Sequence, residues 1–164
     1  MDQNSKLIIR PVEEKDNLSL AKMIRQVFGE HDAPEKGTVY SDPTTDNLYL
    51  LFRAPRSVLW VAEINNEPIG CCGIYPTKGL PATCAELVKF YISKDNRGKG
   101  TGKELMKRCI QSAKEFGYNL LYLESLPHFA KAVRMYEKQG FIGLDEPLGK
   151  SEHTACNIWM IKEL

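Results

Sequence analysis

The run Arg97-Gly98-Lys99-Gly100-Thr101-Gly102-Lys103 connects an apolar segment before it to an amphipathic segment after it. Three glycines within five positions let the backbone turn sharply and let an anion approach the main chain without meeting Cβ atoms. The helix expected to follow begins with N–H groups that have no intrahelical partner, at the positive end of its dipole. The run therefore predicts a binding site for a phosphate-bearing ligand.

The run does not match the two most common phosphate-binding motifs. A P-loop requires Ser or Thr after its Gly-Lys pair, but Gly102-Lys103 is followed by Glu104, and Arg97 stands where the first glycine should be. A dinucleotide motif, Gly-x-Gly-x-x-Gly, would need its third glycine at Lys103 or Leu105. An NTP-binding or dinucleotide-binding protein is therefore disfavoured.

The pattern that fits is Gln/Arg-x-x-Gly-x-Gly/Ala, through Arg97, Gly100 and Gly102. It resembles the acetyl-CoA pyrophosphate loop of the GCN5-related N-acetyltransferases, the GNAT family. Residues 85–92 resemble that family's fourth strand, and residues 132–141 resemble its second motif, Ala-x-x-x-Tyr-x-Lys-x-Gly-Phe. The resemblance implies an α/β (α+β) fold with a GNAT-like mixed central sheet flanked by helices on both faces. It also implies an acyltransferase that uses acetyl-CoA as its acyl-donor cosubstrate.

The resemblance further assigns the cosubstrate-binding residues. The pantetheine arm is expected along the backbone at Phe90 and Ile92. An asparagine that usually bonds the pantetheine amide is replaced by Phe129, so this contact is either missing or supplied by Ser125 or His128. The residues expected to hold the pyrophosphate are Arg97, Gly98, Lys99, Gly100, Thr101, Gly102 and Lys103.

Acetyl transfer to an amine requires a base for the amine proton and an acid for the departing thiolate. The resemblance assigns the acid to Tyr136, although packing on a helix face explains the same residue. Glu86 is the leading base, because a strand would place it on one face with Val88, Phe90 and Ile92, where apolar neighbours raise the pKa of a carboxyl. The alternative for Glu86 is an ion pair with Lys89, Arg97 or a substrate ammonium. Glu124 is a weaker base candidate.

Composition favours one enzyme-sized domain over residues 1–164, without targeting or membrane segments. A net charge of +1 predicts neither a nucleic-acid partner nor a membrane surface. Five cysteines without a paired spacing favour a reducing, cytoplasmic setting, and the three isolated histidines predict no metal site. A homodimer is left open.

Hydrophobic periodicity predicts the order of the elements. Strands are expected at residues 7–10, 58–64, 69–75, 85–92 and 120–123, from 141 onward, and at 156–161. Helices are expected from an N-cap at Asp16 or Asn17 to Gly29, from the glycine run to Gly117, and over 128–139, with a short helix near 45–52. This order also predicts a mixed sheet with helices on both faces.

The acceptor is expected to be a primary amine, either a small molecule or, as the alternative, a protein lysine or N-terminus. Residues 30–56 form an irregular segment that resembles the family's acceptor region, and they contain acidic and aromatic side chains suited to a cationic amine. These residues are Asp32, Tyr40, Asp42, Asp46 and Tyr49. A second class of function is a non-catalytic acyl-CoA-binding or regulatory module on the same fold.

Overall fold

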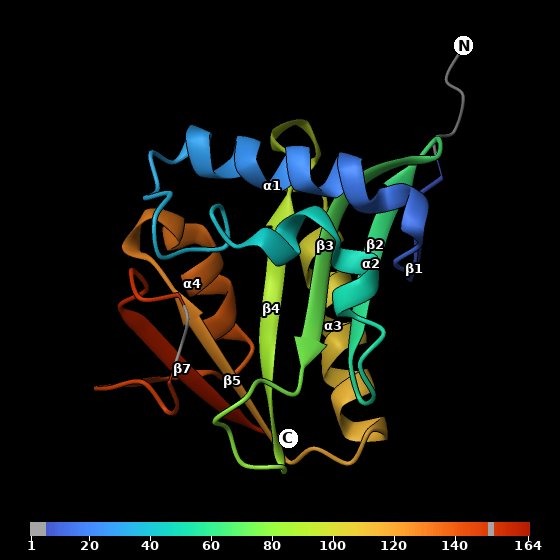
Figure 1. The fold of residues 1–164 in the computed structure, drawn as a ribbon. Coiled ribbons are helices and arrows are strands. Elements are labelled where there is room, and N and C mark those ends of the chain that lie inside the picture. The colour runs from blue at the N-terminus through green and yellow to red at the C-terminus, as the bar shows by residue number, and fades with distance from the viewer. Residues whose placement is uncertain (1–5, 151–152) are drawn as a thin grey trace.

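The computed structural model describes residues 6–150 and 153–164, and over these residues a seven-stranded mixed sheet forms the centre of the molecule (Figure 1). The strand order is β1-β2-β3-β4-β5-β7-β6, and only the β4–β5 pair is parallel. The strands are β1 (Ile8–Pro11), β2 (Val58–Ile64), β3 (Glu67–Tyr75), β4 (Cys84–Ile92), β5 (Leu120–Ser125), β6 (Ile142–Leu144) and β7 (Ile158–Glu163). The α-helices are α1 (Asn17–Glu30), α2 (Leu48–Leu51), α3 (Thr101–Glu115) and α4 (Ala130–Lys138).

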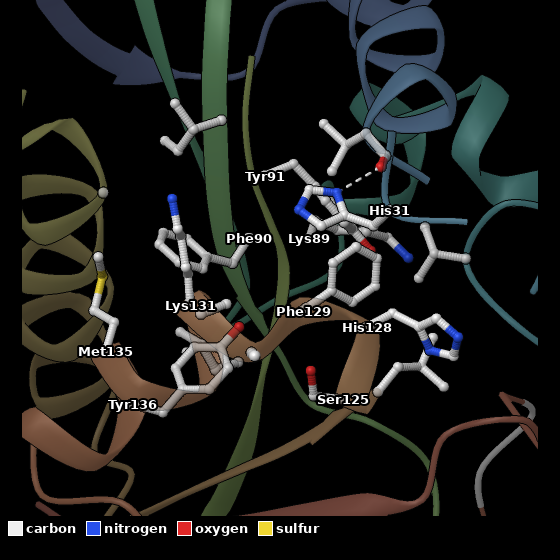
Figure 2. A pocket seen from close by; sticks show the side chains of 18 of the residues that line it. His31, Lys89, Phe90, Tyr91, Ser125, His128, Phe129, Lys131, Met135 and Tyr136 are labelled. Atoms are coloured by element: carbon white, nitrogen blue, oxygen red, sulfur yellow. Dashed lines mark hydrogen bonds between the residues drawn. The ribbon is translucent and has the colours of Figure 1, made fainter. Parts of the chain in front are cut away.

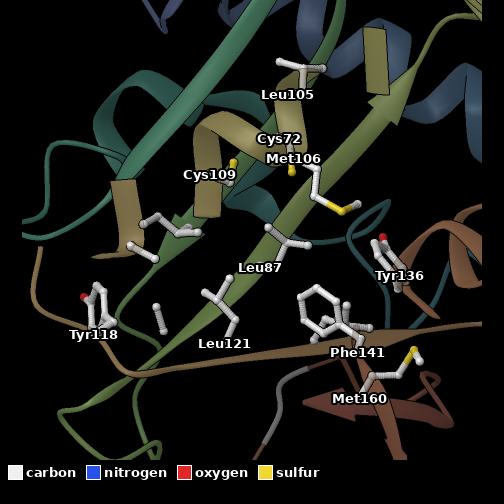
Figure 3. Close-up of a cluster of buried hydrophobic side chains, with 14 of the residues drawn as sticks. Cys72, Leu87, Leu105, Met106, Cys109, Tyr118, Leu121, Tyr136, Phe141 and Met160 are labelled. Atoms are coloured by element: carbon white, nitrogen blue, oxygen red, sulfur yellow. The ribbon is translucent and has the colours of Figure 1, made fainter. Parts of the chain in front are cut away.

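Helices cover both faces of the sheet, as predicted. On the α1 face, α1 and α2 pack on the sheet through a core that includes Ile24, Leu48 and Val61. On the α3 face, α3 and α4 pack through a second core, in which Leu105 and Leu121 are fully buried (Figure 3). Figure 1 shows α1 and α2 in front of the sheet and α3 behind it. The predicted fold class is confirmed.

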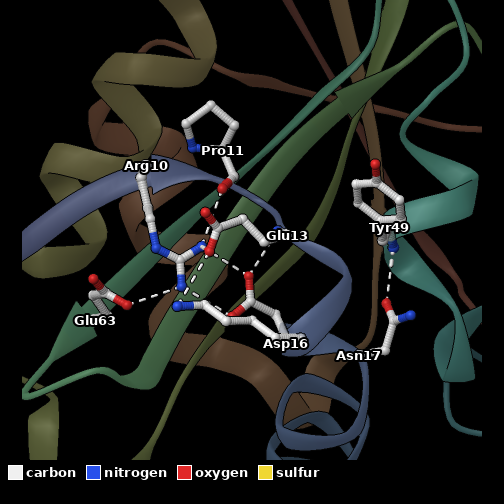
Figure 4. A network of polar contacts seen from close by, with 8 residues as sticks. Arg10, Pro11, Glu13, Asp16, Asn17, Tyr49 and Glu63 are labelled. Atoms are coloured by element: carbon white, nitrogen blue, oxygen red, sulfur yellow. Dashed lines mark hydrogen bonds and ion pairs between the residues drawn. The ribbon is translucent and has the colours of Figure 1, made fainter.

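A buried ion network ties α1 to the edge of the sheet. Arg10 of β1 donates to both oxygens of Asp16 at 2.8 and 2.9 Å and to Glu63 of β2 at 2.8 Å (Figure 4). Asp16 stands at the N-cap position of α1 but makes no capping bond to it, and the Asn17 side chain accepts from the Tyr49 N–H instead. The predicted capping role was therefore wrong for both residues, because these longer-range partners engage the two side chains.

The predicted element boundaries agree with the structure to within a few residues. The short helix near 45–52 is present as a 3-10 turn, Pro43–Asp46, followed by α2. The helix predicted over 128–139 is divided into a 3-10 turn, Pro127–Phe129, and α4. β7 begins two residues later than predicted because its pairing with β5 starts at Ile158 opposite Ser125. No helix within residues 6–150 or 153–164 is long and apolar enough to cross a membrane.

Candidate active site

A β-bulge in β4 shapes the centre of the site. Val88 pairs with Gly73 and Tyr91 pairs with Cys71, so one extra residue of β4 lies opposite β3 between these pairs. Lys89 lies in this interval and has a φ of 57°, in the left-handed region that a lysine rarely adopts. On the other side of β4, pairing with β5 ends at Glu86, and the two strands diverge beyond it (Figure 1).

The bulge changes which side chains share a face. Glu86 and Val88 keep the same face, but Phe90 and Ile92 pack with the α3-face core, whereas Val88 packs with the α1-face core. The prediction that Glu86, Val88, Phe90 and Ile92 share one face was therefore wrong. The extra residue reverses the alternation of a regular strand, so β4 presents its later apolar side chains toward α3.

A cavity of about 680 Å³ opens where β4 and β5 diverge. Glu86, Tyr136 and every residue predicted for the cosubstrate line it, except Lys99, which is exposed outside it. The lining also includes residues of α1 and α4 (Figure 2). The sequence prediction missed Lys131 and Arg134, although their i, i+3 spacing, which places both on one side of the predicted helix, was a usable signal.

The glycine run forms one end of the cavity and leaves the start of α3 open. Gly98 and Gly100 have φ values of 75° and 83°, and no atom lies within 4 Å of where a Cβ would sit on either. Gly100 is the N-cap of α3 and supplies no side-chain cap, so the first N–H groups of the helix face this space. A Cβ on Gly102 would lie 3.0 Å from the Phe90 ring. The run therefore combines room for an anion with uncapped donors.

Arg97 holds the loop in place. Its Nε donates to the Ile92 carbonyl at 2.9 Å, and its guanidinium pairs with Glu30 of α1 at 2.7 Å. These contacts link the end of β4, the glycine run and α1. Arg97 also lines the cavity, and it makes no ion pair with Glu86 among the described residues. Of the partners proposed in the alternative interpretation of Glu86, Arg97 is therefore wrong, and a substrate ammonium stays a prediction.

Tyr136 projects from α4 into the cavity (Figure 2). The residue is 7% exposed, and its ring centroid lies 5.9 Å from the ring centroids of both Phe90 and Phe141. Its hydroxyl makes no hydrogen bond within the described part of the chain, so no local carbonyl occupies it. Burial, with a smaller contribution from Cys72, raises the pKa of Tyr136 well above its usual value. The hydroxyl is therefore protonated at neutral pH and able to donate.

Glu86 is buried beside the same cavity and is 8% exposed. Its Oε1 accepts a hydrogen bond from the Thr77 hydroxyl at 2.7 Å. Burial raises the pKa of Glu86 to about 7, with Glu124 adding to the rise and with Thr77 and Lys89 opposing it. The predicted rise in pKa is confirmed, and its main cause is desolvation. A carboxyl with this pKa exchanges a proton readily near neutral pH.

Glu124 lies next to Glu86 in the lining of the cavity. Its Oε2 accepts from the Tyr122 hydroxyl at 2.8 Å, but its buried Oε1 has no partner among the described residues. Phe129 occupies the position where the family's asparagine was expected. Its ring centroid lies 5.2 Å from that of Phe28 and 5.3 Å from that of His31. Ser125 and His128 both line the cavity and remain the candidate replacements.

The cysteines are unpaired, and two acidic residues of the predicted acceptor region already have partners. All five cysteines are unpaired, and burial raises the pKa of Cys84 to about 11 and that of Cys156 to about 12, so these thiols are not poised as nucleophiles. Asp46 pairs with Arg25 at 2.6 Å, and Asp42 pairs with His153 at 2.9 Å. Over residues 6–150 and 153–164, no cluster of His, Cys, Asp or Glu is suited to a metal ion.

The chain is similar to known acetyltransferases. The family model described as Acetyltransferase (GNAT) family matches residues 25–141. The Escherichia coli (strain K12) protein named Uncharacterized N-acetyltransferase YjgM is 35% identical over 158 residues, which cover 96% of this chain and 95% of that protein.

Solved structures share the fold at low sequence identity. A GNAT-family acetyltransferase from Staphylococcus aureus Mu50 superposes with a TM-score of 0.85 and 20% identity, over 96% of this chain and 99% of that one. The protein yncA from Salmonella typhimurium, solved with its cofactor acetyl-CoA, superposes with a TM-score of 0.73 and 18% identity, over 97% and 94% of the two chains.

Proposed function

The chain belongs to the Acetyltransferase (GNAT) family, and on this premise we propose that it transfers an acetyl group from acetyl-CoA to a primary amine by direct attack in a ternary complex. Membership identifies an acyltransferase; the donor, the amine and the mechanism are our proposal. One observation carries it. Glu86, with a pKa of about 7, and Tyr136, whose hydroxyl has no partner among residues 6–150 and 153–164, line the same cavity as the glycine run.

The residues at the glycine run fit acetyl-CoA. Positive φ at Gly98 and Gly100 and the empty space beside them suit a pyrophosphate that approaches the main chain. The uncapped start of α3 supplies N–H donors, and Lys103 adds a positive charge at the cavity. Acetyl-CoA bound to yncA, which shares this fold, supports the same ligand here. The family expectation of a pantetheine arm along β4 agrees with the absence of β5 pairing beyond Glu86.

When bound, acetyl-CoA would supply a thioester whose carbonyl carbon the amine attacks and whose sulfur leaves. In this proposal, Glu86 accepts the ammonium proton of the acceptor, because an amine with a free pKa near ~10.4 is mostly protonated at neutral pH. Tyr136 donates its proton to the leaving sulfur, and the second proton that the attacking nitrogen loses as the amide forms restores the Tyr136 hydroxyl. Backbone N–H groups of β4 beyond the bulge stabilise the developing negative charge on the carbonyl oxygen.

We further propose a small-molecule acceptor and a cytoplasmic setting. The cavity is a recess of about 680 Å³ lined from both faces of the sheet, which suits a compact acceptor opposite the cosubstrate. The unpaired state of all five cysteines supports a reducing compartment. A protein lysine or N-terminus is the alternative acceptor, and peptide substrates test it.

The cosubstrate assignment is tested with two nearly isosteric variants. Gly100→Asp and Gly100→Asn both place a side chain in the open space at a φ that Asp and Asn tolerate, but only the first adds a charge. Two like charges about 4 Å apart repel by about 1–4 kcal/mol near a protein surface. We therefore expect calorimetry to show acetyl-CoA binding at least about tenfold weaker for Gly100→Asp than for Gly100→Asn. Equal affinities would contradict pyrophosphate binding at the run.

The reaction is tested by release of free thiol from acetyl-CoA across a panel of small amines and lysine-containing peptides. Acceleration by one or more small amines is expected. If only peptides accelerate release, the acceptor is a protein. If acetyl-CoA binds but no amine accelerates its turnover, the proposed reaction is wrong.

A further inference from the structure

Lys89 is a buried lysine in the wall of the cavity. The residue is 6% exposed, lies at the β4 bulge and lines the cavity together with His31 and Phe129 (Figure 2). Within the described part of the chain, its ammonium group makes no hydrogen bond and no ion pair. Burial of an ammonium group without a partner is costly, so the position requires an explanation beyond packing.

The acidic groups that face Lys89 are already engaged. Asp42 accepts from the Thr44 N–H at 2.9 Å and from the Thr44 hydroxyl at 2.7 Å, and it pairs with His153. Glu86 accepts from Thr77. Burial lowers the pKa of Lys89, while Asp42, Glu86 and the Cys71 thiol act to raise it. Neither carboxylate lies within ion-pair distance of the lysine, so its charge is balanced only at longer range.

The same cavity also presents carboxyl groups. Glu86 and Glu124 both line it, and the buried Oε1 of Glu124 has no partner among the described residues. One wall thus offers acceptors for an ammonium group, and Lys89 offers a cation for a carboxylate. A ligand with one charge of each sign satisfies all three side chains. A diamine or polyamine would instead bring a second cation toward Lys89.

We propose that Lys89 binds the carboxylate of an amino carboxylic acid, whose amine is the group acetylated. This inference rests on the proposed acetyl transfer and narrows its acceptor to zwitterionic amino acids. The amine then lies toward Glu86 and Glu124, and the carboxylate toward Lys89. Lys89 is a binding residue in this scheme and takes no part in proton transfer.

The test compares L-α-amino acids with their carboxamides and with the amines that lack the carboxyl group, using thiol release from acetyl-CoA. A hydrogen bond to a charged group that is lost in a buried site typically changes binding about ten- to a hundred-fold. We expect kcat/KM of the wild type to favour the best amino acid over its carboxamide by that factor. Loss of Lys89 also raises the pKa of Glu86, so wild type and variant are compared at a pH above the ionisation of Glu86 in both proteins. There, Lys89→Met should lower kcat/KM for the amino acid by a similar factor, mainly through KM, and lower that for the carboxamide much less. The exposed Lys22→Met serves as the control and should change neither.

Two results would overturn the inference while the acetyl transfer stands. One is a wild type that acetylates carboxamides or simple amines as well as amino acids. The other is an equal loss for acid and carboxamide in Lys89→Met, which would indicate a structural or proton-transfer role. The wild-type preference needs no variant, so it decides the question even if Lys89→Met does not fold. Absence of thiol release with every acceptor would overturn the proposed function and this inference together.

A binding measurement separates recognition from turnover. Calorimetry in the presence of CoA compares an N-acetyl amino acid with its N-acetyl carboxamide. We expect tighter binding of the acid to the wild type and loss of that difference in Lys89→Met. Equal binding of both compounds to the wild type would contradict a role for Lys89 in carboxylate recognition.

Discussion

The pH dependence of turnover should follow the ionisation of Glu86. Burial raises the pKa of this carboxyl to about 7, and a base acts only in its deprotonated form. The wild-type kcat/KM should therefore rise with pH through an apparent pKa near 7 and lose about tenfold for each pH unit below it. Glu86→Gln keeps the shape and removes the base. Its turnover at neutral pH should fall by about 10²–10⁴-fold and recover in part at high pH, where more of the amine is already neutral.

The neighbours of Glu86 allow the direction of the shift to be tested. The Thr77 hydroxyl donates to Glu86 at 2.7 Å and stabilises its ionised form. Thr77→Val should therefore move the rising limb of the pH profile of kcat/KM to higher pH. A hydrogen bond to a charged group contributes about 1.5–3 kcal/mol, which corresponds to a shift of about one to two pH units. Glu124 acts in the opposite sense, because its charge disfavours a second carboxylate nearby. Glu124→Gln should move the limb to lower pH.

The assay is the pH profile of kcat/KM for each variant, measured by thiol release. Deprotonation of the free amine also produces a rising limb, but its pKa belongs to the substrate and does not respond to Thr77 or Glu124. If both variants leave the limb in place, Glu86 is not the group that titrates. If Glu86→Gln raises the acceptor KM with little change in kcat, the carboxylate holds the ammonium group instead. Unchanged kinetics would remove Glu86 from the mechanism.

Two further predictions concern the acid and the fold. Tyr136→Phe should lower kcat by about one to three decades, within the usual range for a lost proton donor, and leave acetyl-CoA affinity nearly unchanged in calorimetry. The control is Tyr118→Phe, which removes a buried hydroxyl outside the cavity. Full turnover in Tyr136→Phe would show that Tyr136 has only a packing role. Arg10→Met should lower the free energy of unfolding in urea by about 3–5 kcal/mol, because Asp16 and Glu63 would remain buried without their cation. A loss below about 1 kcal/mol would show that water reaches these carboxylates.

Local patterns made much of the fold predictable from the sequence. The apolar spacing of α1 and α3 and the glycine run between β4 and α3 depend on neighbours within one or two turns. The ion pair of Arg10 with Glu63 could not be predicted from local patterns, because Glu63 is distant in the chain and only the β1–β2 pairing brings the two residues together. The N-cap prediction at Asp16 failed because its carboxylate accepts from Arg10 and from the Glu13 N–H instead of from the first turn of α1.

The centre of the site was less predictable because the bulge has no local signature. Lysine at a positive φ is rare, and no turn residue marks position 89. The face prediction for Phe90 and Ile92 therefore followed regular alternation and was wrong. Lys89 was predicted only as an ion-pair partner of Glu86, and its burial could not be anticipated because lysine is almost never fully buried in folded proteins. In contrast, the raised pKa of Glu86 was predictable, because the residues next to it are apolar whichever face they occupy.

The bulge connects the two halves of the proposed chemistry. Phe90 and Ile92 turn their side chains toward α3. The ring centroid of Phe90 lies 5.9 Å from that of Tyr136, and the Phe90 ring packs against Gly102 in the first turn of α3. On the α1 face, the bulge adds Lys89 to the wall that already contains Glu86. A regular strand would not present both sets of groups around one cavity.

This arrangement has a cost in stability that depends on pH. A carboxyl whose pKa is raised by folding holds its proton more tightly in the folded state, so the fold loses stability as pH rises from the ordinary value of 4.5 through about 7. For Glu86 the difference corresponds to about 3 kcal/mol above that range. Lys89 carries a penalty of the same kind, since burial disfavours its charged form. Glu86 and Lys89 attract each other at longer range, but in both groups the cost of burying the charged form is larger than this attraction. Their retention on one strand is best explained by a ligand that carries the complementary charges.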